Sequence, residues 1–372
     1  MIDIRPWLDK LDGALDPAHA AAADDRQCRA CTFQPVDRLP LVIGVGDVPG
    51  WPRHEIDRAF YDRDLMLMNE LRPIYASALI GDNRANTIRA NFGVGIIASL
   101  FGCGIRLTHD AMPWVDALGD VDAIRRIVRS GPPDMHGGLW PRIAECQDYF
   151  HVRLAEYPNL RRCVRLSMCD MQGPFSIAHE VWGNGIWYAA ADEPELVDAF
   201  MEVVTETYLR FIEQERVAAG AAEDFTEFIS ALMPGKVMIR EDSAINLSPA
   251  MYERFCRPYI QRVLDQWPGG IHYCGAGHQI FGMVAEYRNL LAMNFGNASM
   301  QRPELVRSRL VDRGIAVVGW NDWPPADAIA SAPTGVSLET SVEALDDGRR
   351  LWESFLAGTE HNRARAAIRV NP

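Results

Sequence analysis

The chain has 372 residues, of which 48% are hydrophobic and 23% charged, as in water-soluble globular proteins. This length allows one large barrel or two ordinary domains. Its 50 acidic and 37 basic residues give a net charge of -13, which argues against a surface for nucleic acid or anionic membranes. No apolar run approaches the roughly 18 residues of a membrane span. Eight cysteines without a signal-peptide pattern at Met1 predict a reducing, cytoplasmic location.

Residues 1–36 are predicted to form a polar, helical N-terminal extension that precedes the main domain. This segment contains one C-x-x-C pair, Cys28 and Cys31. A structural zinc site would need a second pair at similar spacing, and none is present. We therefore interpret this pair as incidental.

Short apolar strands then alternate with helices. The expected strands are 39–46, 77–81, 163–168, 236–240, 270–274, 290–295, 315–319 and 335–338. The first helix is expected over 57–71, where Pro73 ends it. Polar residues follow nearly every strand: Asp47, Asp82, Asp170, Gln172, Glu241, Asp242, Ser243, Asn297, Asn321, Asp322 and Glu339. The alternation predicts an α/β (β/α)8 TIM barrel over 37–372, with the active site where the strands end. An open doubly wound sheet is the alternative, but no phosphate-binding glycine motif follows the first strand.

The most distinctive stretch is His272-Tyr-Cys274-Gly275, at the end of an expected strand. Alternate residues of a strand point to the same side, so the imidazole of His272 and the thiol of Cys274 would face one way. Such a pair can bind a metal ion or act in catalysis. The alternative is a buried thiol beside a histidine that is satisfied within the core.

Two arginines and several aromatic residues are candidates for substrate binding. Arg84 and Arg89 flank a turn and could hold a carboxylate or phosphate, although surface salt bridges would explain them equally well. Tryptophans are expected around the predicted mouth at positions Trp51, Trp182, Trp187, Trp320 and Trp323. They could wall a flat or apolar ligand, or they could pack between loops.

Taken in order, several motifs resemble the uroporphyrinogen decarboxylase superfamily, which includes the methylcobamide:coenzyme M methyltransferases. The resemblance covers roughly residues 38–356. The motifs that carry it are Ile80-Gly-Asp82, Gln172-Gly-Pro-Phe175, Asp242-Ser243 with Leu247-Ser-Pro249 and Tyr252, and Ile271-His-Tyr-Cys-Gly275. The last of these is similar to the H-x-C-G motif of the methyltransferase branch. The resemblance implies a single TIM barrel.

The chain departs from both branches of the superfamily. The loop 46–50 lacks the arginines that bind propionates in the decarboxylases. Glu180 stands where a tyrosine is expected, and Thr334 where the branches place a histidine or a second cysteine. The methyltransferase resemblance implies zinc bound by His272 and Cys274.

The third zinc ligand is open. It is expected among four residues: His278, Glu241, Asp242 and Glu339.

Three functions remain open. The first is methyl transfer involving a corrinoid or related acceptor at the zinc site, with Asp82 and Asp170 orienting substrate or moving protons. The second is metal-free decarboxylation of a porphyrinogen-like or smaller acid, since Asp82 and Ser243 match residues of that branch. The third is a barrel that binds a corrinoid or tetrapyrrole without catalysis.

A small molecule is the expected substrate. Its candidate binding residues are Arg84, Arg89, Gln172, Asn297, Asn321 and Trp320. A corrinoid protein is a candidate partner, whereas nucleic acid and membrane are not. The sequence does not determine the oligomeric state, and a homodimer is one candidate because twofold oligomers are the commonest.

Overall fold

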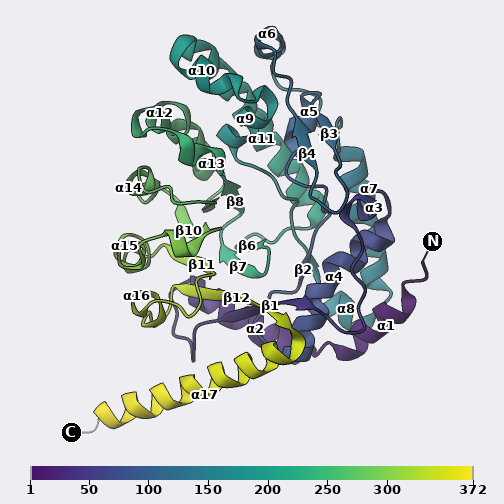
Figure 1. Cartoon of the computed structure of the whole chain (residues 1–372), viewed down its shortest axis with the longest axis vertical. Coiled ribbons are helices and arrows are strands. Elements are labelled where there is room, and N and C mark those ends of the chain that lie inside the picture. Colours follow the sequence, from purple (N-terminus) through teal and green to yellow (C-terminus); the bar gives the residue numbers. More distant parts are fainter. Residues whose placement is uncertain (1, 371–372) are drawn as a thin grey trace.

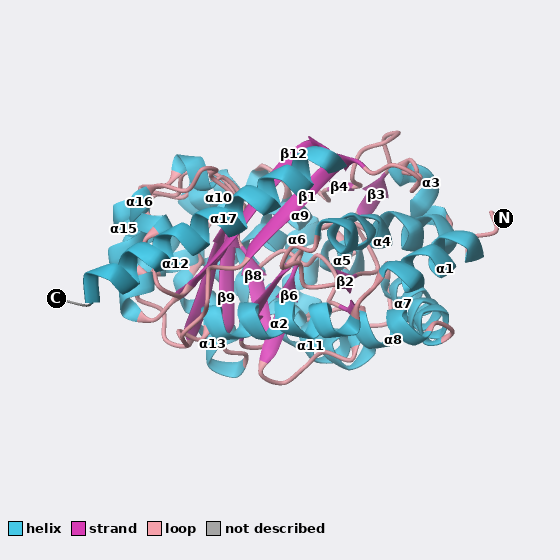
Figure 2. Cartoon of the chain, turned by 90° about the horizontal axis from the view of Figure 1, so that it is seen from below, coloured by secondary structure: helices cyan, strands magenta, loops and turns pink. Residues whose placement is uncertain are grey.

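The computed structural model describes residues 2–370, and side chains for residues 2–358. The last two residues of the expected barrel domain therefore lie outside the described part. Within it, the strands lie at the centre of the molecule and helices surround them (Figures 1 and 2).

A ring of parallel strands forms the barrel. A six-stranded sheet runs in the order β1-β12-β11-β10-β9-β8, and β2 and β5 form a separate parallel pair. The backbone joins the pair to the sheet on both sides: the Asn83 N–H donates to the Leu41 carbonyl (3.0 Å), and Gln172 bridges to Arg240 in parallel. The ring of described strands thus contains eight, which confirms the expected (β/α)8 barrel. Their bounds are β1 (Leu41–Asp47), β2 (Thr87–Ile88), β5 (Arg165–Leu166), β8 (Val237–Arg240), β9 (Gly269–Tyr273), β10 (Leu290–Phe295), β11 (Ala316–Trp320) and β12 (Val336–Ala344).

Helices cover the outside of the ring. Many begin with proline at the first helical positions. Proline has no N–H, and an N–H at these positions would have no acceptor within the helix. The helices are α1 (Arg5–Ala14), α2 (Pro17–Cys31), α3 (Ile56–Tyr61), α4 (Arg63–Ile80), α5 (Ile96–Leu100), α6 (Val121–Ser130), α7 (Trp140–Ala155), α8 (Pro158–Cys163), α9 (Pro174–Trp182), α10 (Gly185–Asp192), α11 (Pro194–Ala219), α12 (Pro249–Phe255), α13 (Arg257–Gln266), α14 (Phe281–Val284), α15 (Pro303–Arg309), α16 (Asp327–Ala330) and α17 (Leu345–Val370). Short 3-10 turns are η1 (Ser243–Asn246), η2 (Ala298–Met300) and η3 (Val311–Arg313).

One expected strand is a helix. The apolar run 77–81 is the last turn of α4, which continues through Pro73 to Ile80. A short apolar run in a helix that is buried on most sides resembles a buried strand, because neither shows an alternating pattern. The second barrel strand is therefore β2, which lies further along the chain and is followed by Arg89.

A β-hairpin occupies the inside of the barrel. Its strands, β6 (Phe225–Phe228) and β7 (Ala231–Pro234), pair antiparallel, and both lie near the centre of the ring in Figure 1. Phe228, Ala231 and Met233 pack against inward-facing residues of the barrel strands, among them Met238, Ala292, Ala316 and Val318. The hairpin therefore fills one end of the barrel and forms a floor below the other.

Helix α2 fixes this floor from outside. The side chain of Gln27 is buried; its Nε2 donates to the Ser230 carbonyl (3.2 Å), and its Oε1 accepts from the Leu232 N–H (2.7 Å). The Gly335 N–H, just before β12, donates to the Ala30 carbonyl (2.8 Å). The N-terminal helices thus contact the barrel directly.

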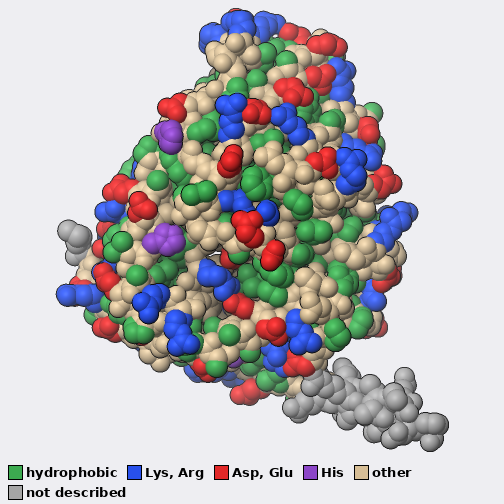
Figure 3. Space-filling view, turned by 180° about the vertical axis from the view of Figure 1, so that it is seen from behind, with side chains coloured by type: hydrophobic (Ala, Val, Ile, Leu, Met, Phe, Trp, Pro, Cys, Tyr) green, Lys and Arg blue, Asp and Glu red, His purple; other side chains and the backbone are tan. Residues whose placement is uncertain are grey.

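Another short antiparallel pair, β3 (Gly104–Arg106) and β4 (Trp114–Asp116), lies in the connection after β2. Acidic and basic side chains are interspersed over the face shown in Figure 3. Among the described helices, none combines the length and apolar character that crossing a bilayer requires.

Candidate metal centre

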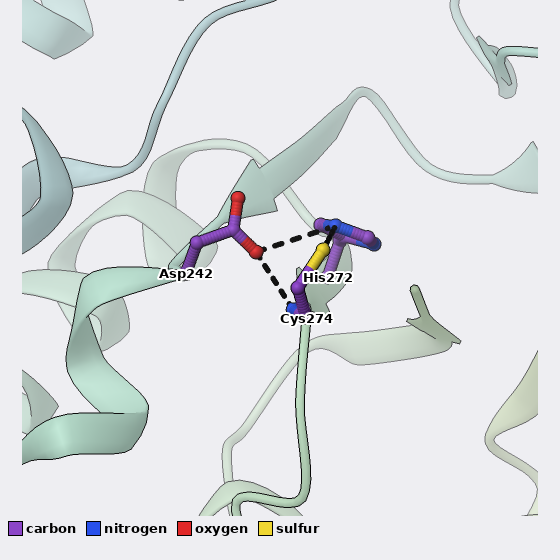
Figure 4. A group of neighbouring side chains, drawn as sticks. All are labelled: Asp242, His272 and Cys274. Carbon is purple, nitrogen blue, oxygen red and sulfur yellow. Dashed lines mark hydrogen bonds and ion pairs between the residues drawn. The ribbon is translucent and has the colours of Figure 1, made fainter. Parts of the chain in front are cut away.

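Three candidate ligands meet at the ends of β8 and β9 (Figure 4). His272 lies in β9, Cys274 follows that strand directly, and Asp242 lies two residues beyond the end of β8. The register places Arg240 beside His272. Because side chains alternate along a strand, Arg240 and Asp242 share one side, and Glu241 points to the other. One ligand atom from each of the three residues lies within 4.8 Å of the other two.

The spacing of these atoms fits a zinc ion. His272 Nε2 is 3.4 Å from Asp242 Oδ1 and 3.5 Å from Cys274 Sγ. Tetrahedral zinc, with bonds of about 2.1 Å to nitrogen and oxygen and about 2.3 Å to sulfur, would separate these pairs by roughly 3.4 Å and 3.6 Å. Three protein ligands would leave a fourth position open, as in catalytic zinc sites.

The hydrogen bonds around His272 direct its free nitrogen to this centre. Asn294 Nδ2 donates to the Val318 carbonyl (2.7 Å), which turns Oδ1 of the same amide toward the imidazole. Nδ1 of His272 lies 2.6 Å from that oxygen and must carry the hydrogen. Nε2 then keeps its lone pair for a cation, the usual arrangement of a metal-binding histidine.

Asp242 and Cys274 are positioned by each other and by Gln172. Asp242 Oδ1 accepts from the Cys274 N–H (2.7 Å), and Oδ2 accepts from Gln172 Nε2 (3.3 Å). Burial alone would raise the pKa of Asp242, but His272 and the Cys274 N–H outweigh it and lower the pKa to about 2. Burial, assisted by the negative charge of Asp242, raises the pKa of Cys274 to about 12. Without a cation the thiol therefore stays protonated and is a poor nucleophile.

A buried ionic network adjoins the centre. Asp170 forms ion pairs with Arg89 (3.0 Å) and Arg240 (3.0 Å). Burial alone would raise the pKa of Asp170, but the two arginines hold it below its ordinary value. The guanidinium of Arg240 also lies over the ring of Phe228 in the hairpin (5.0 Å). Asp170 is therefore an ionised anchor for two arginines, and Arg89 is engaged at this network.

Glu180, on α9, is a buried carboxyl group whose position the sequence did not reveal. Its Oε2 has no hydrogen-bond partner among the residues that the structure describes. Burial raises its pKa well above the ordinary value, and the negative charges of Asp170 and Asp242 add to the effect. The raised pKa favours the protonated form of Glu180, which can donate a hydrogen bond or a proton. The only sequence signal for this group was that Glu180 stands where the resemblance expects a tyrosine. Protonated glutamate and tyrosine are both uncharged hydrogen-bond donors.

Ser243 lies beside the centre, in η1. Its Oγ is 2.9 Å from His179 Nδ1, and its N–H donates to Ser176 Oγ (3.0 Å). The ring of His179 contacts that of Trp187, with 4.9 Å between centroids. Ser243 thus joins the Asp242 loop to α9 and its aromatic neighbour.

Of the residues expected as third ligand, Asp242 lies with His272 and Cys274, and Glu241 lies apart from them. Glu241, which is 2% exposed, accepts hydrogen bonds from the N–H groups of Phe175 (3.1 Å) and Ser176 (3.0 Å) at the start of α9. Burial raises its pKa to about 7, although these hydrogen bonds lower it. Its side chain points away from His272, because odd and even residues at this strand end face opposite sides. Asp242 takes the place expected for Glu241.

Glu339 is also absent from the three-residue group. It belongs to β12, and a Cβ added to Gly319 would lie 3.2 Å from its Oε2. Thr334 precedes β12, and its Oγ1 donates to the carbonyls of Ala30 (3.1 Å) and Gln34 (2.9 Å). It thus lies at the opposite end of the barrel from His272, and its identity does not bear on the ligand set.

Asp82 does not reach the mouth, contrary to the expected catalytic role. Its side chain has no exposed surface. It accepts hydrogen bonds from Ser77 Oγ and from the N–H groups of Ile43 (2.7 Å) and Arg84 (3.2 Å). The carboxylate therefore ties the end of α4 to β1, because Asp82 begins the approach to a strand instead of ending one.

Three residues expected to bind substrate have structural contacts instead. Asn297 Oδ1 accepts from the Gly275 N–H (2.8 Å), and Asn321 Oδ1 accepts from the Ala298 N–H (3.0 Å). Trp320 is 1% exposed and belongs to the core. The two asparagines each fasten one rim loop to the loop of the preceding strand.

Comparison with known proteins agrees with this architecture. The family model of uroporphyrinogen decarboxylase (URO-D) matches residues 22–320. A methyltransferase from Methanosarcina mazei has a similar structure, with a TM-score of 0.61 and 16% sequence identity over 92% of this chain and 99% of that one. No curated protein sequence matches. The structure is thus a parallel barrel with polar residues at its strand ends. Because the family model matches residues 22–320, the chain belongs to the uroporphyrinogen decarboxylase family.

Proposed function

We propose that the protein is a methyltransferase with a zinc ion held by Asp242, His272 and Cys274, and with a corrinoid as methyl donor or acceptor. The observation that carries this proposal is the spacing of the three ligand atoms, 3.4 Å and 3.5 Å from His272 Nε2. Family membership is compatible with it. The Methanosarcina mazei methyltransferase, at 16% identity, supports the fold alone.

The chain's own residues would prepare this chemistry. When bound, the cation would lower the pKa of a thiol at its open position, so that a thiolate is available near neutral pH. Ionised Asp242 and Cys274 would balance the charge of a divalent ion, and His272 contributes a neutral nitrogen. Glu180 keeps a proton that it can donate to a substrate group at the mouth, because its pKa is raised.

Metal analysis tests the proposal directly. Protein purified without a histidine tag, loaded with zinc and then dialysed to remove the excess is expected to retain about one zinc ion per chain. The Cys274→Ser, His272→Ala and Asp242→Asn variants should each lose most of it. Cys28→Ser is the matched control, because Cys28 is a half-buried thiol outside the centre and its variant should keep the metal.

Activity provides a second test. Methylcobalamin should lose its methyl group to an added thiol, as measured by its visible absorbance, and Cys274→Ser should abolish this turnover. A wild-type protein that binds no zinc, or a Cys274→Ser variant with full turnover, would refute the proposal. Tight corrinoid binding without any turnover would instead identify a non-catalytic carrier.

The structure does not favour metal-free decarboxylation. That alternative required Asp82 to stabilise an intermediate in the cleft. The Asp82 carboxylate is fully buried and is occupied by hydrogen bonds from three donors.

A further inference from the structure

A cavity lies between α4, β2 and the tip of the β6–β7 hairpin. Glu70, Arg84, Thr87, Arg89 and Ile229 contribute to its lining. Its volume is about 150 Å³, close to that of an engineered protein cavity that takes up one benzene molecule. Arg89 links this cavity to the centre, because it pairs with Asp170 at 3.0 Å in the same ionic network. We refer to this space as the inner chamber.

The inner chamber carries one unmatched positive charge. Among the described residues, no carboxylate oxygen lies within 4.0 Å of the Arg84 guanidinium, and its buried Nε has no hydrogen-bond partner. Arg89 shares Asp170 with Arg240 as its ion-pair partner. Glu70 accepts from the Arg89 N–H (3.1 Å) and from Asn91 Nδ2 (2.9 Å). A half-buried guanidinium without an ion-pair partner favours an anion, and it can bind a carboxylate through two hydrogen bonds.

The nearest acid does not remove this imbalance. Glu339 interacts electrostatically with Arg84, but burial raises the pKa of Glu339 above its ordinary value, although Arg84 opposes that rise. Burial thus shifts Glu339 toward its neutral form, and Glu339 forms no ion pair with Arg84 among the described residues.

Ile229 gives the inner chamber an apolar surface. It lies at the tip of the β6–β7 hairpin, is 54% exposed, and has a φ of 55°. This left-handed conformation is strained for a β-branched residue and suits glycine or asparagine.

Hydrogen bonds hold this tip in place. Thr87 Oγ1 donates to the Ile229 carbonyl (2.9 Å), and the Ala85 N–H donates to the Ser230 carbonyl (2.9 Å). These bonds use only the backbone of the tip. The fold therefore does not require isoleucine here, and the side chain remains free to contact a ligand.

We propose that the inner chamber is a substrate subsite for a small carboxylic acid with an apolar body about the size of one ring. The carboxylate would pair with Arg84, and the apolar body would lie against Ile229. That the bound acid takes part in methyl transfer rests on the proposed function. Its binding does not, because none of the chamber residues named above is a metal ligand.

Calorimetry with benzoate tests this subsite. Benzoate should bind both zinc-loaded and chelator-treated protein, and at least about tenfold more tightly than benzyl alcohol, which lacks the charge, or acetate, which lacks the ring. Arg84→Gln should reduce benzoate affinity about tenfold or more. Arg126→Gln removes an exposed guanidinium on α6 and should leave the affinity unchanged.

Ile229→Gly provides a variant that does not threaten the fold. It should raise the melting temperature by about 1–3 °C because it relieves strain, yet weaken benzoate binding several-fold. Equal affinities for benzoate and benzyl alcohol, or unchanged benzoate binding in both variants, would overturn the proposal. Benzoate binding to protein that takes up no zinc would refute the metal centre alone, so the two proposals fail separately.

Discussion

Replacing Asn294 with leucine should weaken zinc binding without touching a ligand. Asn294 Oδ1 lies 2.6 Å from His272 Nδ1, and Nδ2 donates to the Val318 carbonyl at 2.7 Å. Leucine removes the acceptor that keeps hydrogen on Nδ1 and the lone pair on Nε2. Loss of such a partner typically lowers metal affinity about 10- to 100-fold, or about 1.4 to 2.8 kcal/mol.

Competition with a chromophoric chelator would measure this loss. Asn294→Asp restores an acceptor for Nδ1, so its zinc affinity should exceed that of the leucine variant. Asn159→Leu is the control, since Asn159 bonds to the Asp12 carbonyl (2.8 Å), away from the centre. Zinc affinity of Asn294→Leu equal to that of the unaltered protein would show that this amide does not set the state of His272.

Three further changes have defined outcomes. Gly296→Ala should lower zinc content and turnover at least about tenfold, because the added Cβ would lie 2.5 Å from Cys274 Sγ. Glu180→Gln should flatten the pH dependence of stability. The wild-type fold retains a proton that the unfolded chain releases above the ordinary carboxyl pKa of 4.5, so its stability should fall as pH rises, by up to about 1.4 kcal/mol per unit. Gln27→Leu should lower the free energy of unfolding by about 2–3 kcal/mol, because the buried Leu232 N–H loses its acceptor.

Each of these has a matching measurement and a contrary result. Elemental analysis tests Gly296→Ala, with Gly282→Ala as control because a Cβ there meets nothing within 4 Å; full zinc content would contradict the geometry. Thermal unfolding from pH 5 to 9 tests Glu180→Gln, and identical pH profiles would show that Glu180 ionises normally. Urea unfolding tests Gln27→Leu, where an unchanged midpoint would show that another group satisfies Leu232.

The barrel was predictable because its signal repeats along the chain. Seven of the expected strands overlap strands of the ring, and each apolar run ends at a polar residue. The prediction of a strand at 77–81 was wrong because the buried end of α4 and a buried strand are both short apolar runs. Asp82 was therefore assigned to the wrong end of the barrel.

The metal centre was predictable only in part. The two-residue spacing of His272 and Cys274 places both on one side of a strand, and the structure brings them together. Choosing between Glu241 and Asp242 depends on which residue of β8 faces inward. Sequence pattern favours an apolar residue inside, whereas the charged Arg240 lies beside His272 and pairs with Asp170, from the segment after β5. An ion pair between residues far apart in the sequence produces no local sequence pattern.

The hairpin floor has a consequence for how this enzyme could diverge. The three candidate ligands lie at the ends of β8 and β9, whereas Ile229 lies on a separate segment between α11 and β8. Changes at the hairpin tip can therefore reshape what the barrel accommodates while the ligand loops stay intact. Relatives with the same three ligands and a different tip would be expected to act on other acids, so the tip is the position to vary in a search for new substrates.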